Sequence, residues 1–233
     1  MDAIDKVRIL VVGDSGVGKS SLVHLICHNE AAVNPGWTIG CSLEVKLHEY
    51  KEGTPDQKTF FLELWDIGGS SSHKNTRAMF YHNANGLILV HDLTNRKSHG
   101  NLKQWLNEIL DQDKEMGMGR GPSRVRDTLD PENLLGSVKM PILVIGTKQD
   151  LAGEKRVQRS FVAEDLGVDD ISLNCHNPRS LAPGSGLAVK LTRFFDRIIE
   201  SRYYRDMNPN PALLEKRRLL PMNVMNAKSL HGD

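Results

Sequence analysis

The sequence lacks three features that would each point to a particular class of protein. Its 30 lysines and arginines nearly cancel its 29 aspartates and glutamates, leaving a net charge of +1, so the strong positive field of a nucleic-acid-binding protein is missing. Cys27, Cys41 and Cys175 are odd in number and widely spaced, which argues against a disulfide framework. No apolar run approaches the roughly 18 residues of a membrane span. These absences predict a soluble cytoplasmic protein that does not bind nucleic acid.

Targeting signals are also missing at the N-terminus. The first three residues, Met-Asp-Ala, carry no apolar region of the kind found in a secretory signal. Asp2 stands where N-myristoylation would need glycine. The 233 residues are enough for one domain of roughly 150 to 200 residues with extensions.

The most informative feature that is present is a glycine-rich loop at residues 13–20, which reads GDSGVGKS. It matches the pattern G-x-x-x-x-G-K-[ST] and directly follows an apolar run at residues 7–12. The glycines let the backbone curl so that its N–H groups face a phosphate at the start of the next helix. Lys19 can reach the β- and γ-phosphates, and the Ser20 hydroxyl can ligate Mg²⁺. The loop therefore predicts a nucleoside-triphosphate site.

Strand and helix patterns alternate along the chain, as in an α/β fold with a largely parallel sheet. A loop containing Gly53 and Pro55 predicts that the two strands beside it pair as an antiparallel hairpin. Apolar residues recur along one face of the last predicted helix, which indicates core packing. The expected strands cover residues 7–12, 43–50, 59–65, 86–91, 142–145 and 171–173, and the main helices cover residues 19–27, 101–110 and 186–204.

Two segments have few apolar anchors. Residues 111–140 include the run MGMGRGPS, whose backbone breakers predict a mobile insertion. Three prolines, the first at Pro209, predict a poorly ordered tail over residues 206–233. The nucleotide-binding domain is therefore expected within residues 1–205.

Polar residues after the other predicted strands complete the site. Asp66 ends one strand and can hold Mg²⁺ through water, and Gly69 can offer its N–H group to a γ-phosphate. Thr38, between the first helix and the second strand, can ligate the same Mg²⁺. Asp150 can accept hydrogen bonds from the N1–H and exocyclic amine of guanine, which adenine cannot satisfy. The pattern predicts GTP or GDP with Mg²⁺ as ligands.

The runs GDSGVGKS, WTIG, WDIGG, TKQD and ISLNCH, in this order, resemble the motifs of the Ras-superfamily small GTPases. GDSGVGKSSL and YHNANGLILVHDLT are most similar to the Rab proteins, and residues 7–204 carry the resemblance. It implies a Ras-like P-loop GTPase domain, with a mainly parallel sheet, one antiparallel edge strand and helices on both faces. It implies nucleotide contacts at Gly16, Val17, Gly18, Lys19, Ser20, Ser21, Gly69, Lys148, Asp150, Asn174 and Cys175, and Mg²⁺ contacts at Ser20, Thr38 and Asp66.

Two departures from the family pattern affect the guanine end of the site. Thr147 replaces the asparagine of Rab and Ras proteins, but Rho proteins share the TKxD form, so nucleotide binding is expected to survive. The closing loop has two possible registers. Residues 172–174 keep the family's serine, whereas residues 174–176 keep the alternation of the incoming strand and place Cys175 where a backbone N–H meets guanine O6. The alternation favours the second register.

A third departure is Ser70, which occupies the position of the glutamine that orients the attacking water. No catalytic residue is therefore assigned, and slow intrinsic hydrolysis is expected. Two roles stay open. One is a GTP/GDP-controlled regulatory switch in small-GTPase signalling or trafficking. The other is an interaction scaffold with permanently bound GTP that regulates the chaperoning and prenylation of other small GTPases.

The resemblance further implies a homodimer, with regulatory or effector proteins and a chaperone of prenylated small GTPases as partners. Trp37 either packs over the nucleotide or contacts a partner. Since the last cysteine is Cys175, no prenylation and no direct lipid anchor are expected. His24 and His28 have the spacing of a metal-binding pair, but the sequence indicates no third ligand nearby, so packing or surface histidines are expected.

Overall fold

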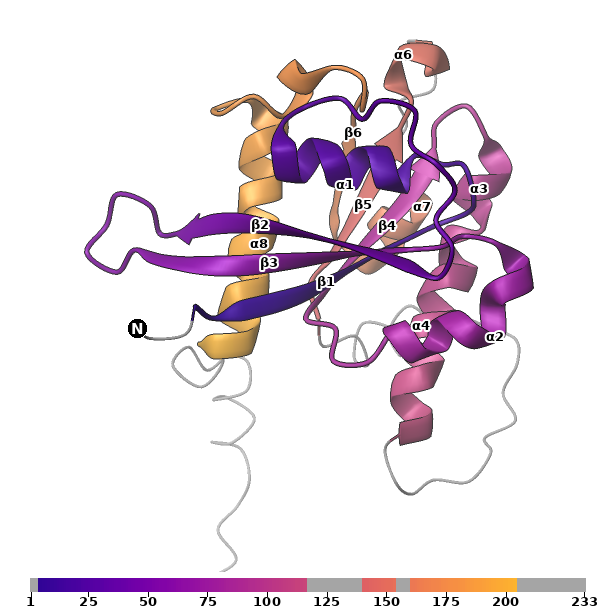
Figure 1. Ribbon diagram of the computed structural model, residues 1–233, viewed down its shortest axis with the longest axis horizontal. Coiled ribbons are helices and arrows are strands. Elements are labelled where there is room, and N and C mark those ends of the chain that lie inside the picture. The colour runs from indigo at the N-terminus through magenta and orange to yellow at the C-terminus, as the bar shows by residue number, and fades with distance from the viewer. Residues whose placement is uncertain (1–3, 117–139, 154–159, 205–233) are drawn as a thin grey trace, which may run out of the picture.

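A six-stranded sheet forms the centre of the computed structural model, which describes residues 4–116, 140–153 and 160–204 (Figure 1). The strands lie in the order β2 (Cys41–Tyr50), β3 (Lys58–Ile67), β1 (Lys6–Val12), β4 (Gly86–Asp92), β5 (Ile142–Thr147) and β6 (Asp169–Ser172). All neighbours are parallel except β2 and β3, which pair antiparallel along their full length. The predicted fold class, including the antiparallel strand at the edge, is confirmed.

The central strands are buried because helices cover both faces of the sheet. Every residue of β4 and of β5 is buried, as their nearly unbroken apolar sequences require. The edge strand β2 differs, since most of its residues keep some contact with solvent and only His48 and Tyr50 are buried. The sheet is therefore exposed to solvent along its β2 edge.

Two apolar clusters hold the layers together, one on each face of the sheet. The first joins the sheet to α1 (Lys19–His28) and α8 (Gly186–Tyr203), and the second joins it to α4 (Leu102–Met116) and α7 (Phe161–Leu166). The predicted apolar face of the last helix is confirmed. Leu187 is partly buried against the first cluster, and five further side chains are buried within it: Leu191, Phe194, Phe195, Ile198 and Ile199.

The structure contains short helices that the sequence patterns did not predict: α2 (Lys74–Arg77), α3 (Arg96–Gly100), α6 (Gln149–Ala152) and α7. Each is too short to develop a periodic apolar face. Helix α4 continues six residues past its predicted end, through the first part of the predicted insertion. Residues 117–139 and the predicted tail, residues 206–233, lie outside the described residues. Within the described residues, no helix is both long and apolar enough to cross a bilayer.

Candidate nucleotide-binding site

The predicted site residues gather at one edge of the sheet because parallel strands all present their carboxyl ends there. The loop of residues 13–18 follows β1, and Asp66 lies near the end of β3. Asp92 and Thr147 are the last residues of β4 and β5, and Cys175 lies just beyond β6. This edge is where open α/β sheets bind their ligands.

The phosphate loop has the geometry of an anion site. Gly13, Gly16 and Gly18 all have positive φ angles, of 151°, 77° and 95°. A side chain at Gly13 would collide with the Val90 carbonyl oxygen, 2.1 Å from the position of its Cβ. Gly18 caps α1 without any side-chain hydrogen bond, so no side chain competes with a ligand for the first N–H groups of the helix.

Lys19 completes this loop from within. Its ammonium donates hydrogen bonds to the carbonyl oxygens of Gly13 and Asp14, each at 2.9 Å, and the residue is 6% exposed. Burial lowers the pKa of Lys19, while the nearby carboxylates of Asp66 and Asp14 oppose that shift. The amine is therefore held against the phosphate loop. A bound phosphate would place a negative charge beside it and offset the cost of burying the charged amine.

Three oxygen ligands meet where the sequence predicts a Mg²⁺ site. Ser20 Oγ and Thr38 Oγ1 both donate to Asp66 Oδ2, at 2.6 and 2.9 Å, and the two hydroxyls lie 3.0 Å apart. Asp66 is 1% exposed, and its Oδ1 has no hydrogen-bond partner among the described residues. Burial raises the pKa of Asp66 against the lowering effect of Ser20 and Lys19. A buried carboxylate with one oxygen unpaired fits a Mg²⁺ ion, which prefers oxygen ligands.

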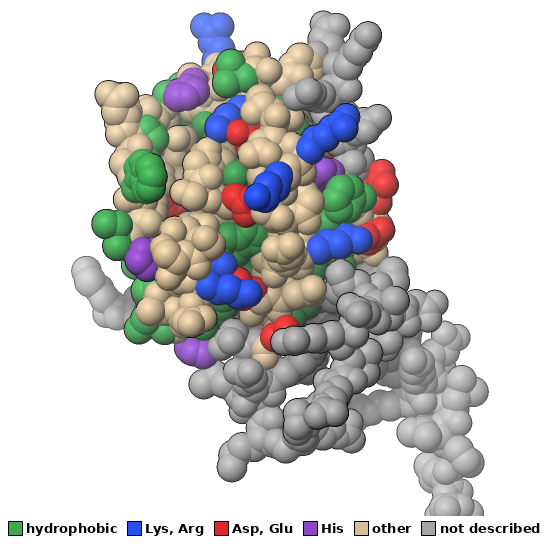
Figure 2. Space-filling model, turned by 90° about the vertical axis from the view of Figure 1, so that its right-hand side faces the viewer, with side chains coloured by type: hydrophobic (Ala, Val, Ile, Leu, Met, Phe, Trp, Pro, Cys, Tyr) green, Lys and Arg blue, Asp and Glu red, His purple; other side chains and the backbone are tan. Residues whose placement is uncertain are grey.

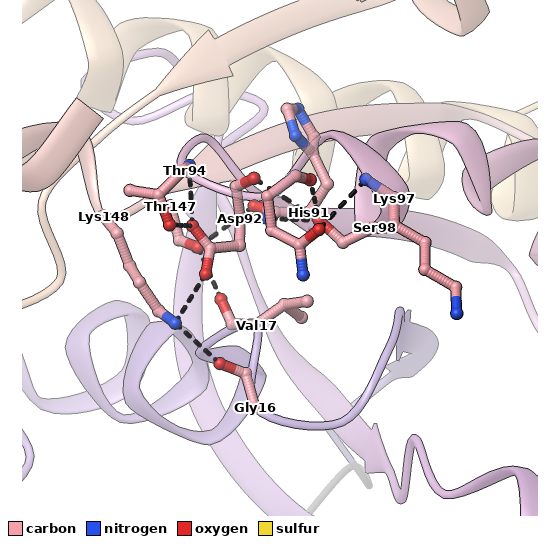
Figure 3. Close-up of polar contacts among 10 residues, drawn as sticks. Gly16, Val17, His91, Asp92, Thr94, Lys97, Ser98, Thr147 and Lys148 are labelled. Atoms are coloured by element: carbon pink, nitrogen blue, oxygen red, sulfur yellow. Dashed lines mark hydrogen bonds and ion pairs between the residues drawn. The ribbon is translucent and has the colours of Figure 1, made fainter. Parts of the chain in front are cut away.

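Lys148 links the phosphate loop to the guanine end of the site (Figure 3). Its Nζ donates to the Gly16 carbonyl at 2.9 Å and to Asp92 Oδ2 at 2.6 Å. Thr94 holds the other Asp92 oxygen through its N–H and its hydroxyl. Burial of Asp92 favours its neutral form, but the hydrogen bonds from Lys148 and Thr94 prevail and lower its pKa. Lys148 is thus held between the phosphate loop and the end of β4.

Asp150 and Cys175 lie close enough to interact electrostatically. Burial, reinforced by the negative charge of Asp150, raises the pKa of Cys175 to about 12. Asp150 itself is exposed in the first turn of α6, while Cys175 is 5% exposed. Both Ile171 and Leu173 are buried, as the alternation requires, and Asn174 and Cys175 lie just beyond β6. The assignment of residues 174–176 as the closing loop stays a prediction.

Thr147 has a structural role that its motif position does not reveal. Its fully buried hydroxyl makes hydrogen bonds with the carbonyl oxygens of Val17 and His91 (Figure 3). These bonds join the phosphate loop to β4. With threonine at this position, the end of β5 is therefore hydrogen-bonded both to the phosphate loop and to β4.

The segments that follow Thr38 and Asp66 contact each other and the phosphate loop. The Gly68 N–H donates to the Gly40 carbonyl at 2.8 Å. A Cβ on Gly69 would lie 2.5 Å from backbone atoms of residues 13–15, so only glycine fits there. Ser70 follows directly, and its hydroxyl lies 2.7 Å from that of Ser72. These contacts place the two segments against each other and against the phosphate loop.

A set of contacts that sequence analysis missed connects the phosphate loop to the segment after Gly69. Asp14 accepts a hydrogen bond from Trp105 Nε1 on α4 at 2.9 Å. The Arg77 guanidinium lies 3.9 Å from the centre of the Trp105 ring and forms a bidentate ion pair with Glu108. Arg77 also donates to the Ser70 carbonyl at 3.1 Å. No local sequence signal indicates these pairs, because the partners are far apart along the chain.

The Trp37 side chain is almost fully exposed. It lies in the loop of residues 29–40, between α1 and β2, and it is 91% exposed. Val33 and Ile39 in the same loop are 88% and 84% exposed. Both interpretations left open by the sequence, packing over a bound nucleotide and contact with a partner, remain predictions.

His91, next to Asp92, is expected to make stability depend on pH between about 4 and 6.5. The residue is 5% exposed, and burial together with the neighbouring His99 lowers its pKa to about 4. The unfolded chain therefore binds a proton that the folded protein excludes, so stability rises with pH across this window. When the pH is lowered from 7.5 to 5, the free energy of unfolding measured in urea should fall by about 2 kcal/mol more in the parent than in His91→Asn.

The control for this experiment is the exposed His176, replaced in the same way. His176→Asn should lose as much stability on acidification as the parent. An equal loss in the parent and in His91→Asn would contradict the assignment.

The fold and the site together define a nucleotide-binding domain of the small-GTPase class. The profile of the family described as "Ras of Complex, Roc, domain of DAPkinase" matches residues 8–118. Rab-like protein 3 of Mus musculus is 49% identical over 228 residues, covering 94% of this chain and 95% of the relative. Rab-like protein 3 of Homo sapiens is 48% identical over the whole of both chains. The chain belongs to the Rab-like protein 3 family of small GTPases.

A more distant relative carries the same class name. The "Small GTPase LIP1" of Arabidopsis thaliana is 34% identical over 234 residues, covering 88% of this chain and 65% of the relative. Membership of the small-GTPase class implies binding of GTP and GDP, and Mg²⁺ is typical of the class.

Proposed function

We propose that the protein is a GTP/GDP-controlled regulatory switch with slow intrinsic hydrolysis. The observation that carries this proposal is the contact of Ser20 and Thr38 with Asp66. It joins the phosphate loop, the exposed loop of residues 29–40 and the end of β3 at one point. Lys19 and the N–H groups at the start of α1 would hold the phosphates, and Ser20, Thr38 and Asp66 would hold Mg²⁺.

The state of the bound phosphates would be communicated through two segments. Thr38 lies in the exposed loop that presents Trp37, and Gly69 lies against the phosphate loop. The hydrogen bond between Gly68 and Gly40 couples the two segments. Loss of the terminal phosphate would therefore alter the surface around Trp37, which is the behaviour of a nucleotide-dependent switch.

Slow hydrolysis follows from the side chain at position 70. Transfer of a phosphoryl group to water requires that the water be held in line with the breaking bond. The Ser70 hydroxyl is two carbons shorter in reach than a glutamine amide, and it is paired with the Ser72 hydroxyl at 2.7 Å. It therefore lacks the length to orient that water.

Ser70→Gln is expected to raise the single-turnover rate of phosphate release by at least about tenfold, because a positioned group commonly contributes 10²–10⁴-fold. Ser71→Gln is the matched control, since it adds the same amide at the neighbouring position. We expect it to leave the rate close to that of the parent. A parent that hydrolyses GTP as fast as Ser70→Gln would contradict the proposal.

A second candidate function is an interaction scaffold that keeps GTP bound and acts as a homodimer. Leu43, Val45 and Leu47 alternate along one face of the edge strand β2 and are 47%, 49% and 60% exposed. They form an apolar face on a strand whose outer edge pairs with no other strand among the described residues, a combination that proteins usually cover. This surface supports a homodimer related by a two-fold axis.

Val45→Lys is expected to weaken self-association, because it places a charge in the centre of this surface. Sedimentation velocity at micromolar concentration should show a dimer for the parent and a larger monomer fraction for the variant. Val189→Lys, on the exposed side of α8, is the matched control and should remain dimeric. A monomeric parent with both GDP and GTP would exclude the dimer.

The remaining partners are proposed from charge and from the resemblance. On the face shown in Figure 2, basic side chains lie next to acidic ones and do not gather in one field. This interleaving supports partners that are proteins, such as regulators, effectors or a chaperone of prenylated small GTPases, and it gives no support to nucleic acid. The free thiols of Cys27, Cys41 and Cys175 support a place in the reducing cytoplasm.

A further inference from the structure

Three potential metal ligands meet on the outer side of α1, away from the residues assigned to the nucleotide. His24 and His28 lie one helical turn apart, and Glu44 lies opposite them on β2. One ligand atom from each residue lies within 4.8 Å of the other two. His28 Nε2 and Glu44 Oε2 are 3.0 Å apart, and the two imidazole rings have their centres 4.6 Å apart. The third ligand that the sequence did not indicate is therefore present.

The surroundings of the cluster suit a bound ion. The side chains of His28 and Glu44 are 51% and 27% exposed, so the cluster opens to solvent on one side. Cys27 precedes His28 on α1, and its thiol makes a side-chain hydrogen bond with Glu44. Outer partners of metal-binding carboxylates supply such a bond.

We infer that His24, His28 and Glu44 form a binding site for a Zn²⁺-class divalent cation. Two imidazole nitrogens and one carboxylate oxygen are a donor set that zinc uses with water in the fourth position, whereas Mg²⁺ and Ca²⁺ select oxygen ligands. Ligands at 2.0–2.1 Å from a tetrahedral ion lie about 3.4 Å apart. The observed cluster therefore needs side-chain movements of roughly 1 Å to close on the ion.

The proposed metal site does not depend on the proposed nucleotide switch. Its position would let a bound ion connect two elements. The ion would connect the last turn of α1 to the first part of β2. These two places bracket residues 29–43, the stretch that holds Thr38 and the exposed Trp37. An ion bound there would restrain both ends of that stretch. A solvent-exposed His–Glu pair without an ion contributes little to the stability of this arrangement.

The site is tested by titrating the full-length, untagged protein with ZnCl₂ against a chromophoric zinc indicator, in excess Mg²⁺. We expect one equivalent of Zn²⁺ to bind. His24→Asn, His28→Asn and Glu44→Gln should each weaken binding by at least about tenfold, because losing even an outer partner of a ligand commonly costs 10–100-fold. His82→Asn changes a histidine outside the cluster and should bind as the parent does.

Glu44→Gln decides the question if a histidine variant fails to fold, since it keeps the shape and most hydrogen bonds of the side chain. Co²⁺ provides a second measurement: the parent should develop the visible absorption of a four-coordinate site, and Glu44→Gln should not. Equal Zn²⁺ affinity in the parent and Glu44→Gln, or no stoichiometric binding to the parent, would overturn the inference.

Discussion

Replacing Arg77 by methionine is expected to lower the free energy of unfolding by about 3–5 kcal/mol. Arg77 donates two hydrogen bonds to Glu108, at 2.6 and 2.7 Å, and the two side chains are only 6% and 12% exposed. Without Arg77, the mostly buried Glu108 carboxylate loses both charge-assisted hydrogen bonds and keeps only the Tyr81 hydroxyl and the weaker attraction of Lys74. Denaturation by urea at pH 7, compared between the parent and the variant, measures the loss.

The matched control for Arg77 removes both charges. Glu108→Gln keeps an acceptor for the Tyr81 hydroxyl, which donates to Glu108 Oε1 at 2.7 Å. We expect the double variant Arg77→Met/Glu108→Gln to regain about half or more of the lost stability, since no unpaired charge is left in the interior. If the double variant is as unstable as Arg77→Met alone, the stacking of the guanidinium on Trp105 is the larger contribution.

Asp150→Asn is expected to lower the affinity for GTP by roughly ten- to a hundredfold, or about 1.5–3 kcal/mol. The carboxylate can accept from both guanine donors, whereas an amide offers one acceptor oxygen and an N–H group that faces a donor. Asp150 lies in the first turn of α6, two residues after Lys148, and it is near Cys175. Competition binding with GTP and ATP measures both the affinity and the preference.

Two comparisons separate base recognition from damage to the fold. Xanthosine triphosphate carries a carbonyl in place of the exocyclic amine of guanine, so it should bind Asp150→Asn better than GTP does. Asp56→Asn, in the exposed loop between β2 and β3, should leave GTP affinity unchanged. Unchanged GTP affinity in Asp150→Asn, or equal affinity of the parent for ATP and GTP, would exclude the guanine assignment.

Much of the site could be predicted because its signals are local. The glycines of residues 13–18 specify a loop that only a residue without a side chain can form, as the close approach of Gly13 to Val90 requires. Asp66 and Thr147 lie at the carboxyl ends of apolar strands, and the rule that parallel strands share one carboxyl edge brings them together. The alternation of Ile171 and Leu173 likewise indicated the register that places Cys175 near Asp150.

Other predictions failed for equally physical reasons. The end of α4 was placed too early because glycine and proline further along suggested a break, whereas the helix continues to Met116. The short helices α2, α3, α6 and α7 carry too few residues for an apolar period. On β2, the alternation of Leu43, Val45 and Leu47 marks an apolar face, but it does not reveal whether anything covers that face.

By itself, the sequence determined the fold class, the phosphate loop and the approximate positions of the strands, because these follow from glycine geometry and side-chain period. Only the tertiary structure decided which distant side chains meet. Glu44 reaches His28 across 16 positions, Arg77 reaches Glu108 across 31 and Trp105 reaches Asp14 across 91. Such contacts depend on how helices pack against the sheet, and a pairwise contact over that separation leaves no periodic trace in a single sequence.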